Sequence, residues 1–192
     1  MNTNPSVASR QRIHILCECS IMIALSAVLS LFTMSPMPQG GSITPVSMLP
    51  VMLIALKYGT KTGLGTTLVY ALVQLGLDLP KLMGYGMSLG VWVGCLIFDY
   101  LIAFTVLGLC GLFRNKGIRG NVIGIIMAIL LRYVSHVISG WIFFGQWAWE
   151  GWSALPYSLV YNATYMLPEM IFTAIVAVIL LRLPTLSKLL RT

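Results

Sequence analysis

The chain has 192 residues, of which 58% are hydrophobic and only 9% are charged, and its mean hydropathy is +0.89. Soluble proteins carry roughly a quarter charged residues, so this composition excludes an ordinary soluble domain and predicts an integral membrane protein. The net charge of +7 does not indicate a nucleic-acid partner, because the basic residues stand at the ends of apolar runs and form no patch.

Long apolar segments separated by short polar ones are typical of a helical bundle, whereas a β-barrel would alternate apolar and polar residues over segments of about ten residues. We therefore expect one all-α domain over residues 1–192, built as a six-transmembrane-helix bundle. The four cysteines form no CxxC pair and have no metal-ligand spacing, so we treat them as small hydrophobic residues.

The first predicted span follows a polar, arginine-containing segment (residues 1–13) and runs to about Met34. It is longer than the hydrophobic region of a signal peptide and has no clear A-x-A cleavage site, so we expect it to be retained. Ser20 and Ala24 form a small-xxx-small pair on this span, which lets another helix approach closely in lipid. Packing within the chain would explain the same spacing.

Residues 35–45 (SPMPQGGSITP) contain three prolines, two glycines and no charge, which predicts an irregular loop. The apolar stretch that follows, residues 46–56, contains Pro50 and is too short to cross a membrane alone. A broken span indicates a binding site, because non-helical backbone at membrane depth must line a cavity or be buried in protein. A short tilted helix with an ordinary loop is the alternative.

The remaining spans are separated by short polar segments. We expect a basic turn at 57–63, a third span to about residue 77, a loop at 78–86, a fourth span at 87–113, a basic turn at 114–120, a fifth span to about 144 and a sixth at 154–181. Six spans place both termini on one side, and that side carries nearly all the lysines and arginines, whereas the opposite loops offer only Lys81. The positive-inside rule then makes both termini cytoplasmic.

Five polar or ionisable side chains fall inside apolar spans, where an ionisable group costs at least about 2.5 to 3.5 kcal/mol at the centre of a lone helix. They are Asp99, Arg132, His136, Asn162 and Glu169. Counted in helical turns from the outer face, Asp99, His136 and Asn162 can meet with Tyr157 in one pocket open to the outside. A buried structural ion pair between Arg132 and Asp99, or with Glu169, is the alternative.

The aromatic residues near the fifth and sixth spans divide into two groups. Trp147, Trp149 and Trp152 are expected at the outer membrane interface as a belt, whereas Phe144 and Tyr157 are better placed to turn inward. Aromatic rings beside a buried carboxylate suit a flat cation. The sequence contains no P-loop, HExxH, GxSxG or paired Cys/His ligands, so we expect no catalytic residue, no metal site and no ATP hydrolysis by this chain.

Several segments resemble one family over nearly the whole chain. RYVSHVISGWIFFGQWAWEGW and YSLVYNATYMLPEMI, with MPQGGSI, MLPVMLIALKYG and IFDYLIAFTVLGLCGLFRNK, resemble the thiamine-specific substrate-binding (S) component of energy-coupling-factor (ECF) vitamin transporters. The resemblance implies a multi-pass protein of the bacterial cell membrane that binds thiamine from outside without a cofactor. It also implies two kinds of partner, a transmembrane coupling (T) protein and two ABC ATPases.

Carried over by position, the resemblance implies Asp99, His136, Phe144, Tyr157 and Asn162 as thiamine contacts, and Ser20 and Ala24 as part of the coupling-protein interface. Asp99 can balance the thiazolium charge or accept from the amino group, Asn162 and Tyr157 can pair with the pyrimidine, and His136 and Phe144 can sandwich a ring. The alternatives are the same scaffold tuned to another vitamin or a thiamine precursor, and a small intramembrane enzyme that uses His136 and Asp99 as acid and base.

Overall fold

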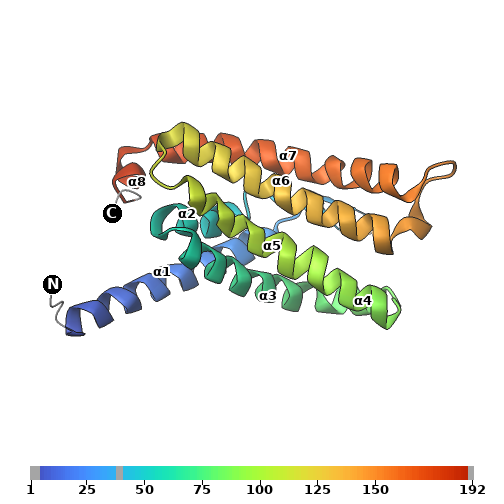
Figure 1. Cartoon of the computed structure of the whole chain (residues 1–192), viewed down its shortest axis with the longest axis horizontal. Helices are drawn as coiled ribbons and strands as arrows, with labels where there is room; N and C mark the ends of the chain where they lie inside the picture. Colours follow the sequence, from blue (N-terminus) through green and yellow to red (C-terminus); the bar gives the residue numbers. More distant parts are fainter. Residues whose placement is uncertain (1–4, 38–40, 190–192) are drawn as a thin grey trace.

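A computed structural model describes residues 5–37 and 41–189, and its regular structure is almost entirely helical, as predicted. The elements are α1 (Pro5–Leu31), β1 (Ser35–Pro36), β2 (Ser42–Ile43), α2 (Leu49–Tyr58), α3 (Thr60–Gly84), α4 (Leu89–Cys95), η1 (Leu96–Ile102), α5 (Ala103–Thr105), η2 (Val106–Phe113), α6 (Gly117–Phe143), η3 (Gly145–Trp147), α7 (Ala154–Arg182) and α8 (Pro184–Leu189). The segments α4 to η2 form one continuous rod, so the described residues contain five long helical segments, α1, α3, the rod, α6 and α7, together with the shorter helix α2 (Figure 1).

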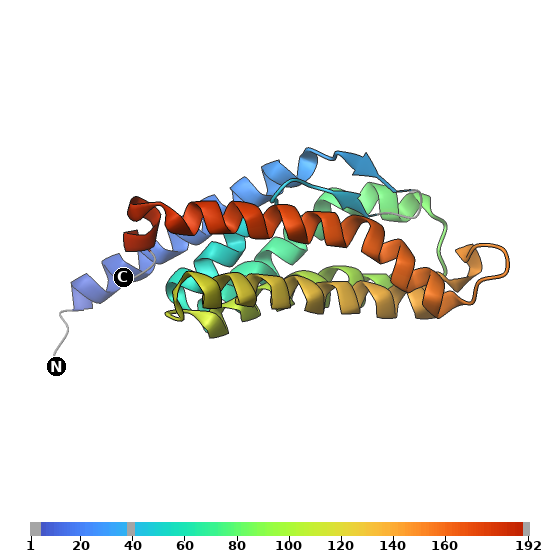
Figure 2. The same ribbon diagram turned by 90° about the horizontal axis from the view of Figure 1, so that it is seen from above.

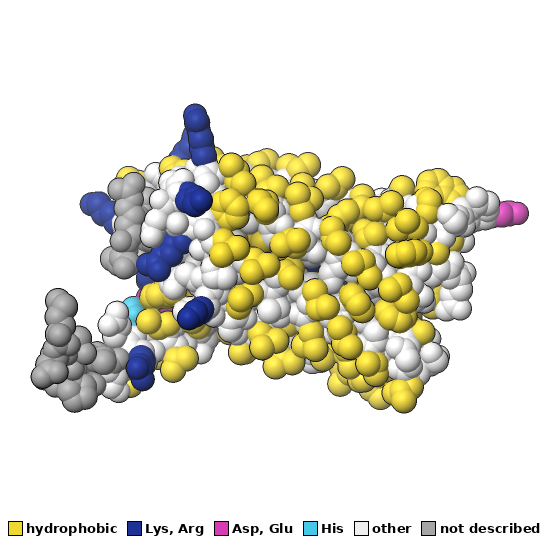
Figure 3. Space-filling view, viewed as in Figure 1, with side chains coloured by type: hydrophobic (Ala, Val, Ile, Leu, Met, Phe, Trp, Pro, Cys, Tyr) yellow, Lys and Arg dark blue, Asp and Glu magenta, His cyan; other side chains and the backbone are white. Residues whose placement is uncertain are grey.

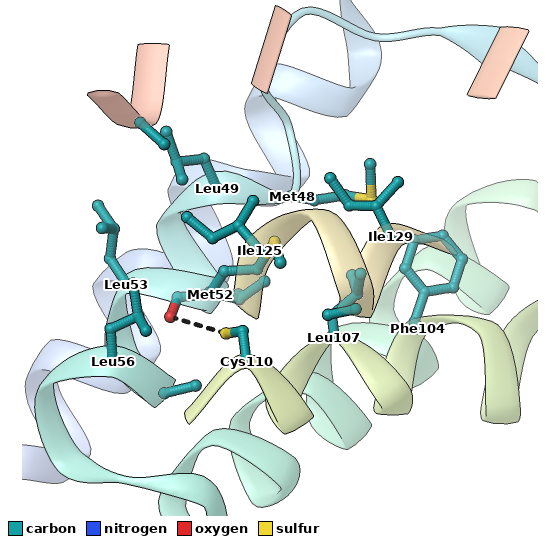
Figure 4. Packing of buried hydrophobic residues seen from close by; sticks show 14 of the residues in the cluster. Met48, Leu49, Met52, Leu53, Leu56, Phe104, Leu107, Cys110, Ile125 and Ile129 are labelled. Carbon is teal, nitrogen blue, oxygen red and sulfur yellow. Dashed lines mark hydrogen bonds between the residues drawn. The ribbon is translucent and has the colours of Figure 1, made fainter. Parts of the chain in front are cut away.

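The short helix α2 forms the centre of the core. Every residue from Leu49 to Leu56 is buried, including Pro50, which occupies the first turn where a missing backbone N–H costs little. Figure 4 shows buried side chains of α2 together with those of η2 and α6, and the Cys110 thiol donates to the Met52 carbonyl oxygen at 3.5 Å. The prediction that this stretch is too short to cross a membrane is confirmed, because the helix has 10 residues.

The predicted loop at 78–86 is wrong over most of its length, because α3 continues as a helix to Gly84. Pro80 stands inside this helix one turn before its end, so it removes only one backbone donor and does not stop the helix. At its other end, α3 is joined to α2 by Gly59 alone. Gly59 has φ +90°, a conformation that favours glycine, and it lets the chain reverse in one residue.

The rod Leu89–Phe113 corresponds to the fourth predicted span, but its backbone is not a uniform α-helix. Its middle, η1, is a π-helix and its C-terminal part, η2, is a 3₁₀-helix. Asp99 and Tyr100 both lie in η1. π-Helical segments are rare and often occur at functional sites, and hydropathy does not reveal them.

The predicted first loop contains a small antiparallel ladder, in which Ser35 pairs with Ile43 and Pro36 with Ser42. Residues 38–40, part of the stretch that resembles the transporter family, lie outside the described residues. Figure 2 shows the two strands beside α7. The loop therefore runs along the bundle and is in contact with it through β2.

The molecule presents an apolar surface to its surroundings, as a protein in lipid does. Many large hydrophobic side chains are exposed along the helices, and in the view of Figure 3 they cover the middle of the molecule. Four helices in the described part are long and apolar enough to cross a membrane: Ser9–Leu31, Leu89–Phe113, Gly117–Phe143 and Ala154–Arg182. Both termini lie at one end of the bundle (Figure 1), and the lysines and arginines visible in Figure 3 gather at that end.

Candidate functional site

A cavity of about 390 Å³ lies among α3, the rod, α6, α7 and the segment after β1. Its wall includes all five residues for which the sequence predicts ligand contacts: Asp99, His136, Phe144, Tyr157 and Asn162. The structure therefore brings these residues to one place, and their role in binding stays a prediction. The volume falls within the range of small-molecule sites, about 300 to 1,000 Å³.

Asp99, His136 and Arg132 form a hydrogen-bonded chain along one side of the cavity. The Arg132 Nε–H donates to His136 Nε2 at 3.3 Å, and His136 Nδ1 lies 2.8 Å from Asp99 Oδ1. Since an arginine can only donate, Nε2 accepts, and the imidazole proton resides on Nδ1 and points to the carboxylate. The alternative of a direct Arg132–Asp99 ion pair is wrong, because His136 lies between the two side chains.

Each oxygen of Asp99 has one donor from the protein. Oδ1 accepts from His136, and Oδ2 accepts from the hydroxyl of the fully buried Ser139 at 2.6 Å. The Asp99 side chain is still 20% exposed, so the remaining lone pairs are open to the cavity. A carboxylate held on both oxygens is fixed in orientation and can accept further hydrogen bonds from a ligand.

Asn162 is also held firmly, which limits what it can offer. Its Nδ2 donates to the Ser158 carbonyl oxygen at 2.8 Å and to Ser158 Oγ at 3.2 Å, and its Oδ1 accepts from the Tyr165 hydroxyl at 2.5 Å. Both amide protons are thereby used, while Oδ1 has a second lone pair. In this arrangement Asn162 can accept from a ligand but has no proton left to donate.

The aromatic side chains near the junction of α6 and α7 differ in their exposure. Phe144 and Tyr157 line the cavity, and Tyr157 is only 3% exposed. Trp149 and Trp152 are each 45% exposed in the loop between η3 and α7, and their place in a membrane-interface belt stays a prediction. Trp147, predicted to lie in the belt with them, is only partly exposed, and its ring centroid lies 5.3 Å from that of Phe144.

The segment that follows β2 is hydrogen-bonded to a buried residue of α7. The Thr44 hydroxyl donates to Glu169 Oε1 at 2.8 Å, and Glu169 is almost completely buried. The Ser47 hydroxyl donates to the same Glu169 oxygen at 3.4 Å. Within the described residues, Glu169 forms no salt bridge with Arg132. Gly41, with φ +81°, packs against the Tyr165 ring so closely that a Cβ would come within 2.7 Å of it.

Ser20 and Ala24 stand apart from the cavity. Both are exposed on α1, and the Ser20 hydroxyl bonds back to the Leu16 carbonyl oxygen at 2.9 Å. On another face of the same helix, Glu18 binds Lys57 at 2.8 Å, which fixes α1 to the end of α2. The two small residues therefore face away from the bundle, where another protein can reach them.

Sequence reasoning missed several polar residues of the cavity wall. They are Asp78, Tyr100, Ser158, Tyr161 and Tyr165, and behind the wall the buried Ser139, which holds Asp99, was missed as well. Tyr100 was signalled by its place beside Asp99, and Ser139 by its place one turn after His136 on the same face. Asp78 carried no usable signal, because the proline and glycines that follow it favoured a loop.

Comparison with known proteins identifies the family. A family profile described as "Thiamine transporter protein (Thia_YuaJ)" matches residues 16–188. Thiamine transporter ThiT of Bacillus subtilis (strain 168) is 36% identical in an alignment of 186 positions, and the match covers 90% of this chain and 92% of that protein. ThiT of Lacticaseibacillus paracasei is 28% identical in an alignment of 179 positions, and the match covers 84% of this chain and 87% of that protein.

The fold agrees with these matches. A solved structure of ThiT from Listeria monocytogenes superposes with a TM-score of 0.75 and 26% identity, and the match covers 94% of this chain and 98% of the other. The family is one of transporters, which sets aside the alternative of an intramembrane enzyme. This chain therefore belongs to the thiamine transporter protein family of multi-pass membrane proteins.

Proposed function

We propose that this chain captures thiamine from outside the cell as the S component of an ECF transporter and delivers it inward with partner subunits. The observation that carries the proposal is the cavity itself. It joins a fixed carboxylate, a neutral imidazole and aromatic rings at membrane depth, which is the chemistry that a flat organic cation requires.

The wall of the cavity matches the groups of thiamine. The amino group of the pyrimidine has two donors, and Asp99 and Asn162 both offer open acceptor lone pairs. The positively charged thiazolium suits the face of Phe144 and the charge of Asp99. His136 donates its only ring proton to Asp99, so it contributes its ring face and the orientation of the carboxylate.

The distribution of charge supports an orientation with both termini in the cytoplasm. Lysines and arginines gather at the end that holds the termini (Figure 3), which the positive-inside rule assigns to the cytoplasm. Phe144 and Tyr157, at the ends of α6 and α7 remote from the termini, line the cavity. In this orientation, the cavity lies toward the outer surface.

The proposal also assigns partners. The exposed pair Ser20 and Ala24 lets a helix of the coupling protein approach α1 closely, because small residues allow backbone contact in lipid. A transmembrane coupling protein and two ABC ATPases would then supply the energy for release. These partners are inferred from the resemblance to S components. The exposure of Ser20 and Ala24 on α1 leaves room for a partner helix there.

Tryptophan fluorescence of the purified chain tests the proposal. Trp147 lies 5.3 Å from Phe144, so a ligand in the cavity should change its emission. We expect saturable quenching by thiamine, with no response to riboflavin or biotin at the same concentrations. A chain that is folded by circular dichroism but shows no saturable response to thiamine would refute the proposal.

A further inference from the structure

A second carboxylate, Asp78, lines the same cavity from α3. Asp78 is half-buried, and its Oδ2 accepts from the Tyr100 hydroxyl at 3.0 Å. Tyr100 follows Asp99 in η1 and lines the cavity as well. Asp99 and Tyr100 are consecutive residues of the rod, and Tyr100 binds Asp78. Asp78 is therefore part of the cavity wall and is not a separate surface group.

The two carboxylates differ in how far the protein compensates their charge. Asp99 has donors on both oxygens, and the Arg132 cation stands behind the imidazole that it binds. Asp78 has one neutral donor, and within residues 5–37 and 41–189 it forms no salt bridge. The charge of Asp78 is therefore the less compensated of the two.

Lys81 is the only other charged group that lines this cavity besides Asp78, Asp99 and Arg132 among the described residues. It follows Asp78 by three residues on α3, but its side chain is exposed and it forms no salt bridge with Asp78. A solvated lysine screens a neighbouring carboxylate weakly. An organic cation inside the cavity is less exposed to water and would interact with Asp78 more strongly.

We propose that Asp78 supplies a second counter-charge for the bound ligand and makes the cavity select a permanently cationic ring over a neutral one of the same shape. The proposal rests on thiamine as the ligand, as argued above. It adds a specificity-determining residue, because the ring charge is then recognised by Asp78 together with Asp99. Tyr100 holds the carboxylate in place through its hydroxyl.

The substitution Asp78→Asn removes the charge and keeps the shape, and its amide oxygen can still accept from Tyr100. The probes are thiamine and deazathiamine, a neutral analogue in which a ring carbon replaces the quaternary nitrogen. We expect D78N to weaken thiamine binding by at least about tenfold and deazathiamine binding by no more than about twofold, measured by calorimetry.

Two control variants separate charge from structure. Glu150→Gln removes an exposed carboxylate that does not line the cavity and should leave the binding of both ligands unchanged. Tyr100→Phe removes the hydrogen bond that holds Asp78 but keeps the charge, so it should weaken thiamine binding less than D78N does. Equal losses for both ligands in D78N, or no loss for thiamine, would overturn the role of Asp78 while thiamine binding by the unaltered chain stands. If the unaltered chain does not bind thiamine, both proposals fall.

Discussion

The substitution Asp99→Asn gives the sharpest test of the binding site. In the structure Asp99 receives the His136 N–H at 2.8 Å and the Ser139 O–H at 2.6 Å. Asparagine can keep its oxygen toward His136 and turn its amide protons toward Ser139, whose hydroxyl can rotate to accept. The unliganded chain should therefore stay folded, and the loss should appear in binding.

The expected change in thiamine affinity follows from the hydrogen bond to a charged acceptor that the ligand would lose. A hydrogen bond to a charged group is worth about 1.5 to 3 kcal/mol, and the variant retains at most a neutral acceptor. We therefore expect Kd for thiamine to rise roughly ten- to a hundredfold. The assay is quenching of tryptophan fluorescence, with thermal unfolding of the ligand-free variant as the check on folding.

Two further variants serve as comparisons for Asp99→Asn. Asp99→Glu keeps the charge and should bind thiamine more tightly than Asp99→Asn. Ser139→Ala removes one donor to the carboxylate but leaves its charge, so its effect should be clearly smaller. Unchanged thiamine affinity in a folded Asp99→Asn protein would refute the reasoning and remove this residue from the site.

Two other predictions concern the first loop and α1. Gly41→Ala combines a strained φ of +81° with a Cβ within 2.7 Å of the Tyr165 ring, and should lower the unfolding free energy by about 1 to 3 kcal/mol in thermal or denaturant unfolding. The matched Gly86→Ala has positive φ but open space, so it should cost less; an equal cost would show that Tyr165 contact does not matter. Ala24→Trp should leave thiamine binding by the purified chain intact but abolish thiamine uptake by cells that contain the partner subunits, because it fills the exposed small-residue face. Leu25→Trp, also on an exposed position of α1, should retain uptake, and normal uptake by Ala24→Trp would contradict the assigned interface.

The sequence predicted the helical architecture well because hydropathy determines where a chain can lie in lipid. The start of α7 at Ala154 and the shortness of α2 were both predicted from apolar runs and the residues that interrupt them. Counting helical turns from the outer face also indicated that Asp99, His136 and Asn162 could share one pocket, and all three line the cavity. Depth along a helix is the property that the sequence encodes most directly.

Lateral relations between helices were harder to predict. Arg132 and Asp99 looked like natural partners, but the rotation of their helices places His136 between them. Asp78 was missed because Pro80 favoured a loop, although α3 continues past it. The hydrogen bonds that restrict Asn162 come from Ser158 and Tyr165. Serine and tyrosine are common in membrane helices, so the sequence did not indicate this role.

The π-helical segment η1 makes the length of the rod as important as its chemistry. Its backbone has the wider i→i+5 geometry over Leu96–Ile102, in which one more residue fits into each turn than in an α-helix. Deleting a single residue there would let the rod close into an ordinary α-helix with its two flanking parts nearly in register, but it would change the directions in which the side chains of the segment itself point. Relatives that share this cavity should thus tolerate exchanges of side chains in the segment more readily than insertions or deletions.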